Sequence, residues 1–369
     1  MGTTLEAATW PIVTAPEAAA ILVRFPQAGA FEQLVWHSPR PFSAAALLRT
    51  DRGEFVLKRH HPRLRSPAAL AKEHAFMAHL RAAGICVPDV VATEHGTGAL
   101  AHDGWTVELH RRAPGLDLYR DRPSWTPFLM PSHAHAAGDA LARLHRAAQG
   151  FVAGERRAHP LVASFTILPA RDPLAAAEAY VAARPALARY LADKPWRADL
   201  ARLFAVLGTG LSEHLADQPV LWTHNDWHPS NMLWAADGTV STVFDFGLAA
   251  PTCALHDLAT AIERTAIPWL HISEGRHDAP TDGADAVALL RGYQAHTALS
   301  RADIATILRL LPLVHLEFAL SEIDYFAGVL QDRDQADLAW HGYALGHADW
   351  FLSPPGQRFL QQLERDALA

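Results

Sequence analysis

The sequence predicts an α+β fold with two lobes: a small, sheet-rich N-lobe over residues 1–112 and a larger, mostly helical C-lobe over residues 113–369. Two observations support this division. Strand-like segments alternate with turn residues before residue 110, and long Ala- and Leu-rich segments follow it. The chain has 369 residues, half of them apolar, which is enough for two large lobes around a cleft.

The strands of the N-lobe are predicted from alternation. Phe55 and Leu57 fall on one face of their strand, and Lys58 falls on the other. Residues 51–53 supply the turn that closes a hairpin with the strand before it. The predicted strands are residues 31–37, 44–49, 54–60, 87–92 and 105–109.

One helix is well marked in the N-lobe. Ser66 suits the N-cap, Pro67 suits the first helical position, and apolar residues follow at helical spacing. Gly84 is placed to end the helix as its C′ residue.

The C-lobe is expected to be helical at residues 132–149, in two or three helices between 174 and 217, and again at 284–368. A short β interruption separates these helices, with a turn at residues 237–238. Its predicted strands are residues 219–222, 232–235 and 240–244.

Composition excludes several classes of protein. The net charge of −7 and a pI near 6.3 argue against a nucleic-acid binder, which would carry a basic surface. The N-terminus lacks the basic and then apolar pattern of a signal peptide, and no apolar run approaches the ~18 residues of a membrane span. A cytoplasmic protein is expected.

The stretch HNDWHPSN, residues 224–231, is the most informative in the chain. It supplies Asp226 and Asn231, and Asp245 follows 19 residues after Asp226, beyond a predicted hairpin. Carboxylate and amide oxygens suit Mg²⁺, which is held by one or two protein carboxylates together with substrate phosphates. A carboxylate that does not bind the metal can accept a proton from an incoming hydroxyl.

Phosphoryl transfer also needs a fixed cation for the phosphates. Lys58 supplies an ammonium on a strand of the N-lobe, and Glu73 on the following helix can pair with it. Such a pair would hold the ammonium in place.

These motifs together resemble the protein-kinase-like fold: H-x-D-x-x-x-x-N, then D-F-G, with V-L-K and K-E-H upstream. In detail the chain looks like the aminoglycoside phosphotransferase family, which also includes choline, homoserine and related small-molecule kinases. The resemblance spans roughly residues 30–330. The segments that carry it are PAALAKEHAFMAHLRAAGICVPDVV, GDALARLHRAA, HNDWHPSN and DFGLAAPTCALHDLA.

The resemblance implies a bilobal kinase that transfers the γ-phosphoryl group of ATP, or GTP, to a small hydroxyl substrate. It implies that Asp226 is the catalytic residue that accepts the hydroxyl proton or orients the hydroxyl. Asn231 and Asp245 would hold Mg²⁺. Lys58, with Glu73 as its partner, would contact the α and β phosphates.

The resemblance also implies supporting roles. His224 would be a structural member of the catalytic loop, and Asp257 would brace that loop from the start of the next helix; an ordinary N-cap is the alternative for Asp257. The hinge that reads the adenine edge through its backbone would lie near Arg111 and Ala113.

The chain departs from the family pattern in one place. Between the first two strands, residues 37–43 form no glycine-rich loop. Backbone amides, or the hydroxyls of Ser38 and Ser43, would then have to cover the phosphates.

Two further patterns have competing interpretations. His224 and His228 have the i, i+4 spacing of a helical zinc pair, but Pro229 and the loop context argue against zinc. Glu317 and Asp324 fall on one face of a predicted apolar helix, either as part of a solvent stripe or as a wall that recognises an amine on the substrate.

Two other functions remain open. A protein kinase is disfavoured because Asp257 follows Gly247 by ten residues, which leaves no room for an activation segment. A non-catalytic nucleotide-binding module is opposed by the complete set of predicted catalytic residues. The sequence does not decide the acceptor (aminoglycoside, homoserine, choline or similar), nor ATP against GTP, nor the oligomeric state.

Overall fold

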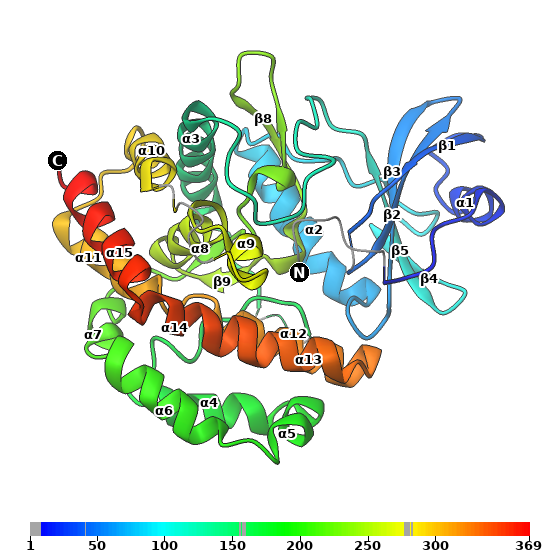
Figure 1. Ribbon diagram of the computed structural model, residues 1–369. Coiled ribbons are helices and arrows are strands. Elements are labelled where there is room, and N and C mark those ends of the chain that lie inside the picture. Colours follow the sequence, from blue (N-terminus) through cyan, green and yellow to red (C-terminus); the bar gives the residue numbers. More distant parts are fainter. Residues whose placement is uncertain (1–8, 41, 155, 157–159, 277–280, 282) are drawn as a thin grey trace. The chain divides into compact units, whose positions relative to one another are not determined.

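The structure is a computed structural model that describes residues 9–40, 42–154, 156, 160–276, 281 and 283–369. Its contacts divide the chain into two compact units (Figure 1). Unit 1 comprises Met1–Ser124, Val152–His159 and Ser230–Phe244, and unit 2 comprises Trp125–Phe151, Pro160–Pro229 and Asp245–Ala369. Both units are therefore discontinuous in sequence, unlike a division by one cut after residue 112.

Unit 1 contains an antiparallel five-stranded sheet in the order β1-β2-β3-β5-β4. The turn before β3 lies at residues 51–52, as predicted from the Asp-Arg-Gly sequence. The strands are β1 (Phe31–His37), β2 (Ala44–Thr50), β3 (Gly53–His60), β4 (Ala99–His102) and β5 (Trp105–Arg111).

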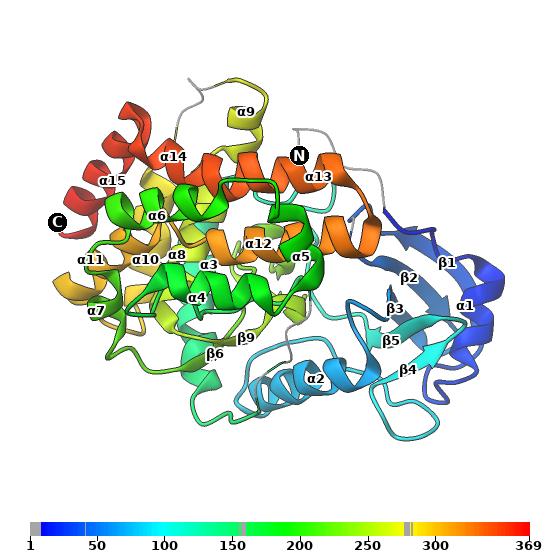
Figure 2. The same ribbon diagram turned by 90° about the horizontal axis from the view of Figure 1, so that it is seen from below.

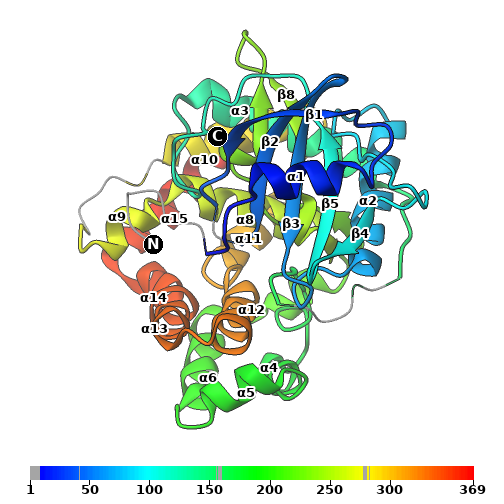
Figure 3. The same cartoon turned by 90° about the vertical axis from the view of Figure 1, so that its right-hand side faces the viewer.

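The two faces of this sheet have different character. Helix α1 (Ala15–Leu22) lies across one face (Figure 3), where Phe55 and Leu57 are fully buried with residues of α1. Lys58 lies on the other face, directly opposite Glu108 of β5. Helix α2 (Pro67–Ala82) covers that second face. The sheet thus keeps its polar side chains together under α2.

Local capping explains the limits of α2. The Ser66 hydroxyl accepts a hydrogen bond of 3.2 Å from the Ala69 amide, and Pro67 occupies the first helical position. Gly84 has φ of +89° just after the helix, where a residue without Cβ adopts the left-handed conformation most readily. The predicted boundaries are confirmed.

One strand predicted for the N-lobe is wrong, and two elements were missed. Residues 87–92 do not form a strand, and only Val90 makes an isolated bridge, to His110. Pro88 lacks an amide donor for a ladder, which limits pairing there. The fourth strand is β4 instead, and helix α1 was not predicted.

A second sheet in unit 1 is the hairpin of β7 (Met232–Trp234) and β8 (Val240–Val243). Its turn contains Gly238 at φ +83°, as the Asp-Gly sequence predicts. Leu116 exchanges two backbone hydrogen bonds with Trp234, which ties the hairpin to the chain that leaves β5.

Unit 2 is built around α3 (Pro131–Ala148) and α10 (Gly283–Gln294), which pack closely along their lengths (Figure 1). The contact is close enough that a Cβ on Gly138 would overlap the Leu289 carbonyl. A Cβ on Gly292 would likewise overlap the His135 carbonyl. Two glycines therefore allow the backbones of these helices to touch.

Helix α12 (Leu316–Tyr325) of unit 2 packs against several other helices of this unit. Figure 2 shows α12 between the α4–α5 pair and the α13–α14 segment. Four helices, not two or three, occupy residues 174–217. The other elements are α4 (Pro173–Ala182), α5 (Pro185–Leu191), α6 (Trp196–Leu207), α7 (Leu211–Leu215), α8 (Ala254–Ala266), α9 (Trp269–Ser273), α11 (Arg301–Leu310), α13 (Arg333–Leu338), α14 (Gly346–Leu352), α15 (Pro354–Ala367), the π-helices η3 (Phe326–Leu330) and η4 (Ala339–Leu345), and the paired strands β6 (Leu221–Thr223) and β9 (Ala250–Thr252).

Candidate active site

The segment HNDWHPSN begins directly after β6, as the sequence predicts. His224 is fully buried, and its Nδ1 accepts a hydrogen bond of 3.2 Å from the Asp226 amide. The His224 ring packs against Trp227 and Phe246 at centroid distances of 5.4 and 4.8 Å. Asn225 has φ of +61°, which turns the chain sharply before Asp226. His224 therefore shapes the loop, and its position fits the predicted structural role.

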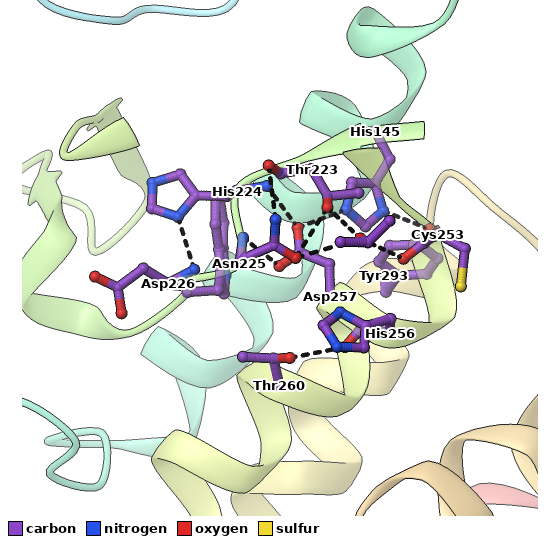
Figure 4. Close-up of polar contacts among 12 residues, drawn as sticks. His145, Thr223, His224, Asn225, Asp226, Cys253, His256, Asp257, Thr260 and Tyr293 are labelled. Carbon is purple, nitrogen blue, oxygen red and sulfur yellow. Dashed lines mark hydrogen bonds and ion pairs between the residues drawn. The ribbon is translucent and has the colours of Figure 1, made fainter. Parts of the chain in front are cut away.

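Asp257 holds this loop from the first turn of α8 (Figure 4). Its carboxylate accepts hydrogen bonds from the amides of His224 and Asn225 at 2.9 and 2.8 Å, and from His145 Nε2 at 3.0 Å. Burial opposes ionisation of Asp257, but the hydrogen bond and charge of His145 outweigh it and lower the pKa of the carboxyl. Asp257 is a brace and not an N-cap, because the N-cap of α8 is Cys253.

Asp226 faces two basic side chains of unit 2. The Arg264 guanidinium forms an ion pair with Asp226 Oδ1, and His228 Nε2 lies 3.4 Å from the same oxygen. Arg264 is almost fully buried and lies over the rings of Trp125 and Phe318, each 5.2 Å away. Burial lowers the pKa of Arg264 to about 10, so the guanidinium remains charged at neutral pH. Asp226 is thus held beside a fixed positive charge.

Arg264 was not predicted from the sequence. It lies 38 residues beyond Asp226, outside every motif that the sequence analysis identified. Its spacing of seven from Asp257 was the available signal, since residues i and i+7 share one face of a helix.

The two proposed metal ligands follow β6 and β8. Asn231 is buried, and its carbonyl accepts a hydrogen bond of 3.0 Å from the amide of Phe244. Asp245 is the next residue and has the left-handed φ of +61°, unusual for a residue with a side chain. The backbone of both proposed metal ligands is thus well defined, by a hydrogen bond at Asn231 and by the left-handed conformation at Asp245.

Lys58 and Glu73 both lie in unit 1, Lys58 on β3 and Glu73 on α2. Burial opposes protonation of His74, but hydrogen bonding and charge from Glu108 outweigh it and raise its pKa; the charge of Glu73 adds to the rise and that of Lys58 reduces it. The carboxylate of Glu73 forms an ion pair of 3.3 Å with Arg156, a partner that the sequence did not suggest. Glu73 is therefore a buried ion-pair residue, and its expected pairing with Lys58 stays a prediction.

The predicted hinge lies at the end of β5. Arg111 is the last residue of that strand, and its guanidinium lies 5.2 Å from the Phe55 ring. The next amide, of Arg112, donates to the Glu54 carbonyl at 3.0 Å. Ala113 follows and is partly buried. The side chain of Arg111 therefore packs on the sheet, and the amides of Arg111 and Arg112 both make backbone hydrogen bonds. Adenine binding by this hinge stays a prediction.

Comparison with known proteins decides the class of this chain. Residues 18–303 match the phosphotransferase enzyme family. The chain belongs to this family. It is a small-molecule kinase, a phosphotransferase that acts on a hydroxyl acceptor.

Several named proteins are similar in sequence to this phosphotransferase. A protein of Granulibacter bethesdensis named homoserine kinase is 27% identical over 277 residues, covering 75% of this chain and 76% of its own. Four other relatives, 27–28% identical, carry the same name.

Solved structures confirm the predicted fold class. The microcompartment-associated aminopropanol kinase matches with a TM-score of 0.61 at 19% identity, over 94% of this chain and 100% of that one. The amicoumacin kinase hAmiN, in complex with AMP-PNP, Ca²⁺ and Ami, matches with a TM-score of 0.56 at 15% identity, over 94% and 92%. Among the described residues of the phosphotransferase, no helix has the length and apolar character to cross a bilayer.

The turn between β1 and β2 of the phosphotransferase has its own hydrogen bonds. The Ser38 amide donates to the Ala45 carbonyl at 2.8 Å, and the Ser38 hydroxyl accepts from the Arg40 amide at 3.3 Å. Pro41 lies outside the described residues. Ser43 is partly buried at the start of β2. Ser38 thus makes two of the hydrogen bonds at the start of this turn.

The polar face of α12 is buried against other parts of unit 2. The carboxylate of Glu317 accepts hydrogen bonds from the amides of Thr166 and Ile167 and from the Thr166 hydroxyl, at 2.7 to 3.1 Å. Asp324 accepts a bond of 3.3 Å from the Leu187 amide. The solvent-stripe interpretation is wrong for Glu317, which is only 3% exposed. An acceptor amine would have to compete with these backbone donors.

The zinc interpretation of His224 and His228 gains no support. His224 Nδ1 is already an acceptor for the Asp226 amide, and His228 points to Asp226. Within the described part of the chain, neither histidine belongs to a cluster of three potential ligands.

Proposed function

We propose that this phosphotransferase transfers the γ-phosphoryl group of ATP, or GTP, to the hydroxyl of a small amine-bearing acceptor such as homoserine or an amino alcohol. The observation that carries the proposal is the position of Asp226. Its carboxylate is 20% exposed, on a loop that Asp257 and His224 hold from beneath. A general base needs this combination of accessibility and fixed geometry.

The names of the relatives support the choice of acceptor. Five relatives are called homoserine kinases, and the structural neighbour with a TM-score of 0.61 is an aminopropanol kinase. Homoserine and aminopropanol both carry an amine and a hydroxyl on a short aliphatic chain. We therefore place this class ahead of aminoglycosides and choline.

In the proposed reaction, Asp226 accepts the proton of the acceptor hydroxyl or orients that hydroxyl toward the phosphorus. Asn231 and Asp245 would hold Mg²⁺, which neutralises charge on the phosphates when it is bound. Lys58 would position the α and β phosphates. The ion pair with Arg264 fixes the direction of the Asp226 carboxylate before substrate arrives.

A single assay tests the proposal. The chain is incubated with Mg²⁺ and ATP or GTP against homoserine, aminopropanol, choline and an aminoglycoside, and nucleoside diphosphate release is followed. Asp226→Ala should lower kcat roughly 10²–10⁴-fold for the true acceptor. Asp217→Asn, at an exposed position of unit 2, is the matched control. Full activity of Asp226→Ala would contradict the assignment.

Asp245→Ala separates metal binding from base catalysis. We expect this variant to lose the Mg²⁺ dependence of nucleotide binding and turnover, whereas Asp226→Ala should keep the Mg²⁺ dependence of nucleotide binding.

The ion pair between Arg264 and Asp226 is the observation that favours the non-catalytic alternative. A nucleotide-binding module would tolerate an Asp226 whose charge is neutralised by Arg264. That alternative predicts nucleotide-dependent thermal stabilisation with no turnover of any acceptor.

A further inference from the structure

Three buried side chains of unit 2 converge beside Arg264, the partner of Asp226, and none of the three is among the proposed phosphoryl-transfer residues. They are Glu263 on α8, His315 just before α12 and His347 on α14, with exposures of 1%, 5% and 7%. One potential ligand atom from each lies within 4.8 Å of the other two. None of the sequence motifs includes these residues, because they come from three distant helices.

The separations match the donor spacing of a metal site. His347 Nδ1 lies 2.8 Å from Glu263 Oε1, and His315 Nδ1 lies 3.8 Å from Glu263 Oε2. Zinc bonds of 2.0–2.1 Å in a tetrahedron place neighbouring donors about 3.4 Å apart. The two observed separations lie on either side of that value, so small side-chain shifts would bring the donors to bonding distance.

A hydrogen-bond network does not account for the position of the His315 ring nitrogens. Its Nδ1 is too far from Glu263 for a hydrogen bond, and its Nε2 has no hydrogen-bond partner in the described part of the chain. A buried nitrogen without a partner is costly. A cation bound at Nδ1 would fix the ring proton on Nε2, where Glu322 could accept it.

The surroundings supply a second shell and counter-charge. Glu322 Oε2 lies 3.6 Å from His315 Nε2, where a carboxylate can orient a metal-bound imidazole. Glu263 contributes a buried negative charge to the cluster. Arg264 is the neighbouring positive charge and opposes a cation, but its guanidinium is paired with Asp226.

Aromatic packing fixes both imidazoles. The Trp269 ring stacks on His347 at 3.7 Å and 6°, and the Trp125 ring meets His315 edge-on at 5.2 Å. The cavity lined by Glu263 and His315 has a volume of about 10 Å³, close to the space for one water-sized sphere. An ion fits such a cavity, whereas an acceptor molecule does not.

A second cluster, in unit 1, has a different character. His74 and His110 direct Nε2 at Glu108 Oε2 at 2.6 and 3.0 Å, and His60 reaches Oε1 at 2.9 Å. All three of these histidines are hydrogen bonded to Glu108, whereas in the Glu263 cluster His347 is hydrogen bonded to Glu263 and His315 is not. This cluster is a hydrogen-bond network and provides a matched control.

We propose that Glu263, His315 and His347 form a site for one divalent transition-metal ion, with Zn²⁺ as the best fit to a two-histidine, one-carboxylate donor set. The fourth coordination position would face the small cavity and hold a water. The proposal does not depend on the identity of the acceptor or on the proposed phosphoryl transfer.

The test uses the full chain without a histidine tag, in excess Mg²⁺ and without nucleotide. Metal content is measured after purification, and Zn²⁺ affinity is measured by competition with a chromophoric chelator. We expect one Zn²⁺ per chain. Glu263→Gln and His347→Gln should each weaken binding at least about tenfold. His110→Gln, in the control cluster, should leave it unchanged.

Cobalt spectroscopy of the unmodified chain keeps the test independent of variant folding. Visible d–d bands of a four- or five-coordinate Co²⁺ should appear and be bleached by one equivalent of Zn²⁺. Absence of saturable Zn²⁺ binding by the unmodified chain, or equal binding by well-folded Glu263→Gln, would overturn the proposal and leave a water as the cavity's occupant.

Discussion

At the residue scale, the catalytic loop depends on one carboxylate that never meets a substrate in the proposed reaction. Asp257 is fully buried and connects two loop amides to His145, which in turn lies 2.9 Å from the Tyr293 hydroxyl. The hydrogen-bond network that links Tyr293 to Asn225 thus passes through one charged group, the Asp257 carboxylate. Loss of that charge would leave several buried donors without an acceptor.

We predict that Asp257→Ala lowers the free energy of unfolding by ~3–5 kcal/mol, because it leaves His145 and two amides unpaired in the core. Urea unfolding followed by circular dichroism measures the change. The free energy of unfolding of Asp257→Asn should fall between those of Asp257→Ala and the unmodified chain. Asp217→Asn should behave as the unmodified chain. A change below about 0.5 kcal/mol for Asp257→Ala would show that the brace is dispensable.

Residues on short motifs were predictable, and residues on helix faces were not. Asp226, Asn231 and Asp245 stand out because their spacing is local in the sequence. Arg264 reaches Asp226 only through the packing of α8 beneath the loop. The sequence alone does not pair Arg264 with Asp226, although the spacing of seven places Arg264 on the helix face of Asp257, and it gives no local signal for the Glu263 cluster.

At the element scale, α12 shows how a polar residue can be an integral part of a buried helix. Glu317 gives its carboxylate to the amides of residues 166 and 167, which have no ladder or helix of their own. The helix therefore stabilises a loop, much as a cap stabilises a helix end.

We predict that Glu317→Gln lowers the free energy of unfolding by about 1–3 kcal/mol, because an amide nitrogen cannot accept from these donors. Urea unfolding measures it, with Glu364→Gln on exposed α15 as the control. The amine-recognition hypothesis predicts a different result, a selective rise in KM for the acceptor at unchanged stability.

The contact of α3 with α10 gives a second prediction for an element. Gly292→Ala should destabilise the chain by roughly 1–3 kcal/mol, because its Cβ would overlap the His135 carbonyl. Gly283→Ala, on the same helix, meets only the Gln362 side chain at 3.5 Å and should be neutral or stabilising. Thermal unfolding of the two variants compares them directly, and equal midpoints would refute the close-contact argument.

The elements that were predicted correctly carry local signals. Helix α2 has a cap, a first-turn proline and a terminal glycine, and the β7–β8 hairpin has Asp-Gly. The strand β9 was missed because its three residues are too few to show a period, and only its pairing with β6 defines it. The strand β4 was missed although Asp103 and Gly104, both at positive φ, mark its hairpin turn to β5.

At the scale of the whole molecule, stability should depend on pH through buried histidines. Burial lowers the pKa of His256 from 6.5 to about 4, so the unfolded chain binds a proton more readily between these values. In unit 1, burial alone would lower the pKa of His74, but hydrogen bonding and charge from Glu108 outweigh it and raise the pKa. The two groups act on opposite sides of pH 6.5.

We predict that the free energy of unfolding falls as pH drops from 6.5 toward 4, by up to about 3 kcal/mol from His256. Above 6.5 it should fall again as His74 loses its proton. Urea unfolding, measured at a series of pH values from 4 to 9 with a chelator present, tests the predicted loss of stability on both sides of pH 6.5. His256→Gln should reduce the loss of stability below pH 6.5 by the share of His256 and leave the loss above pH 6.5 unchanged. His95→Gln, at an exposed position, should change neither.

The interleaving of the two units along the chain has a consequence for synthesis on the ribosome. The last segment of unit 1 ends at Phe244, 120 residues after its first segment ends at Ser124. At translation rates of about 5–20 residues per second, the nascent five-stranded sheet waits roughly 6–24 s for the β7–β8 hairpin. During that interval the growing polypeptide exposes an unfinished surface, so chaperone occupancy should peak before residue 244 emerges.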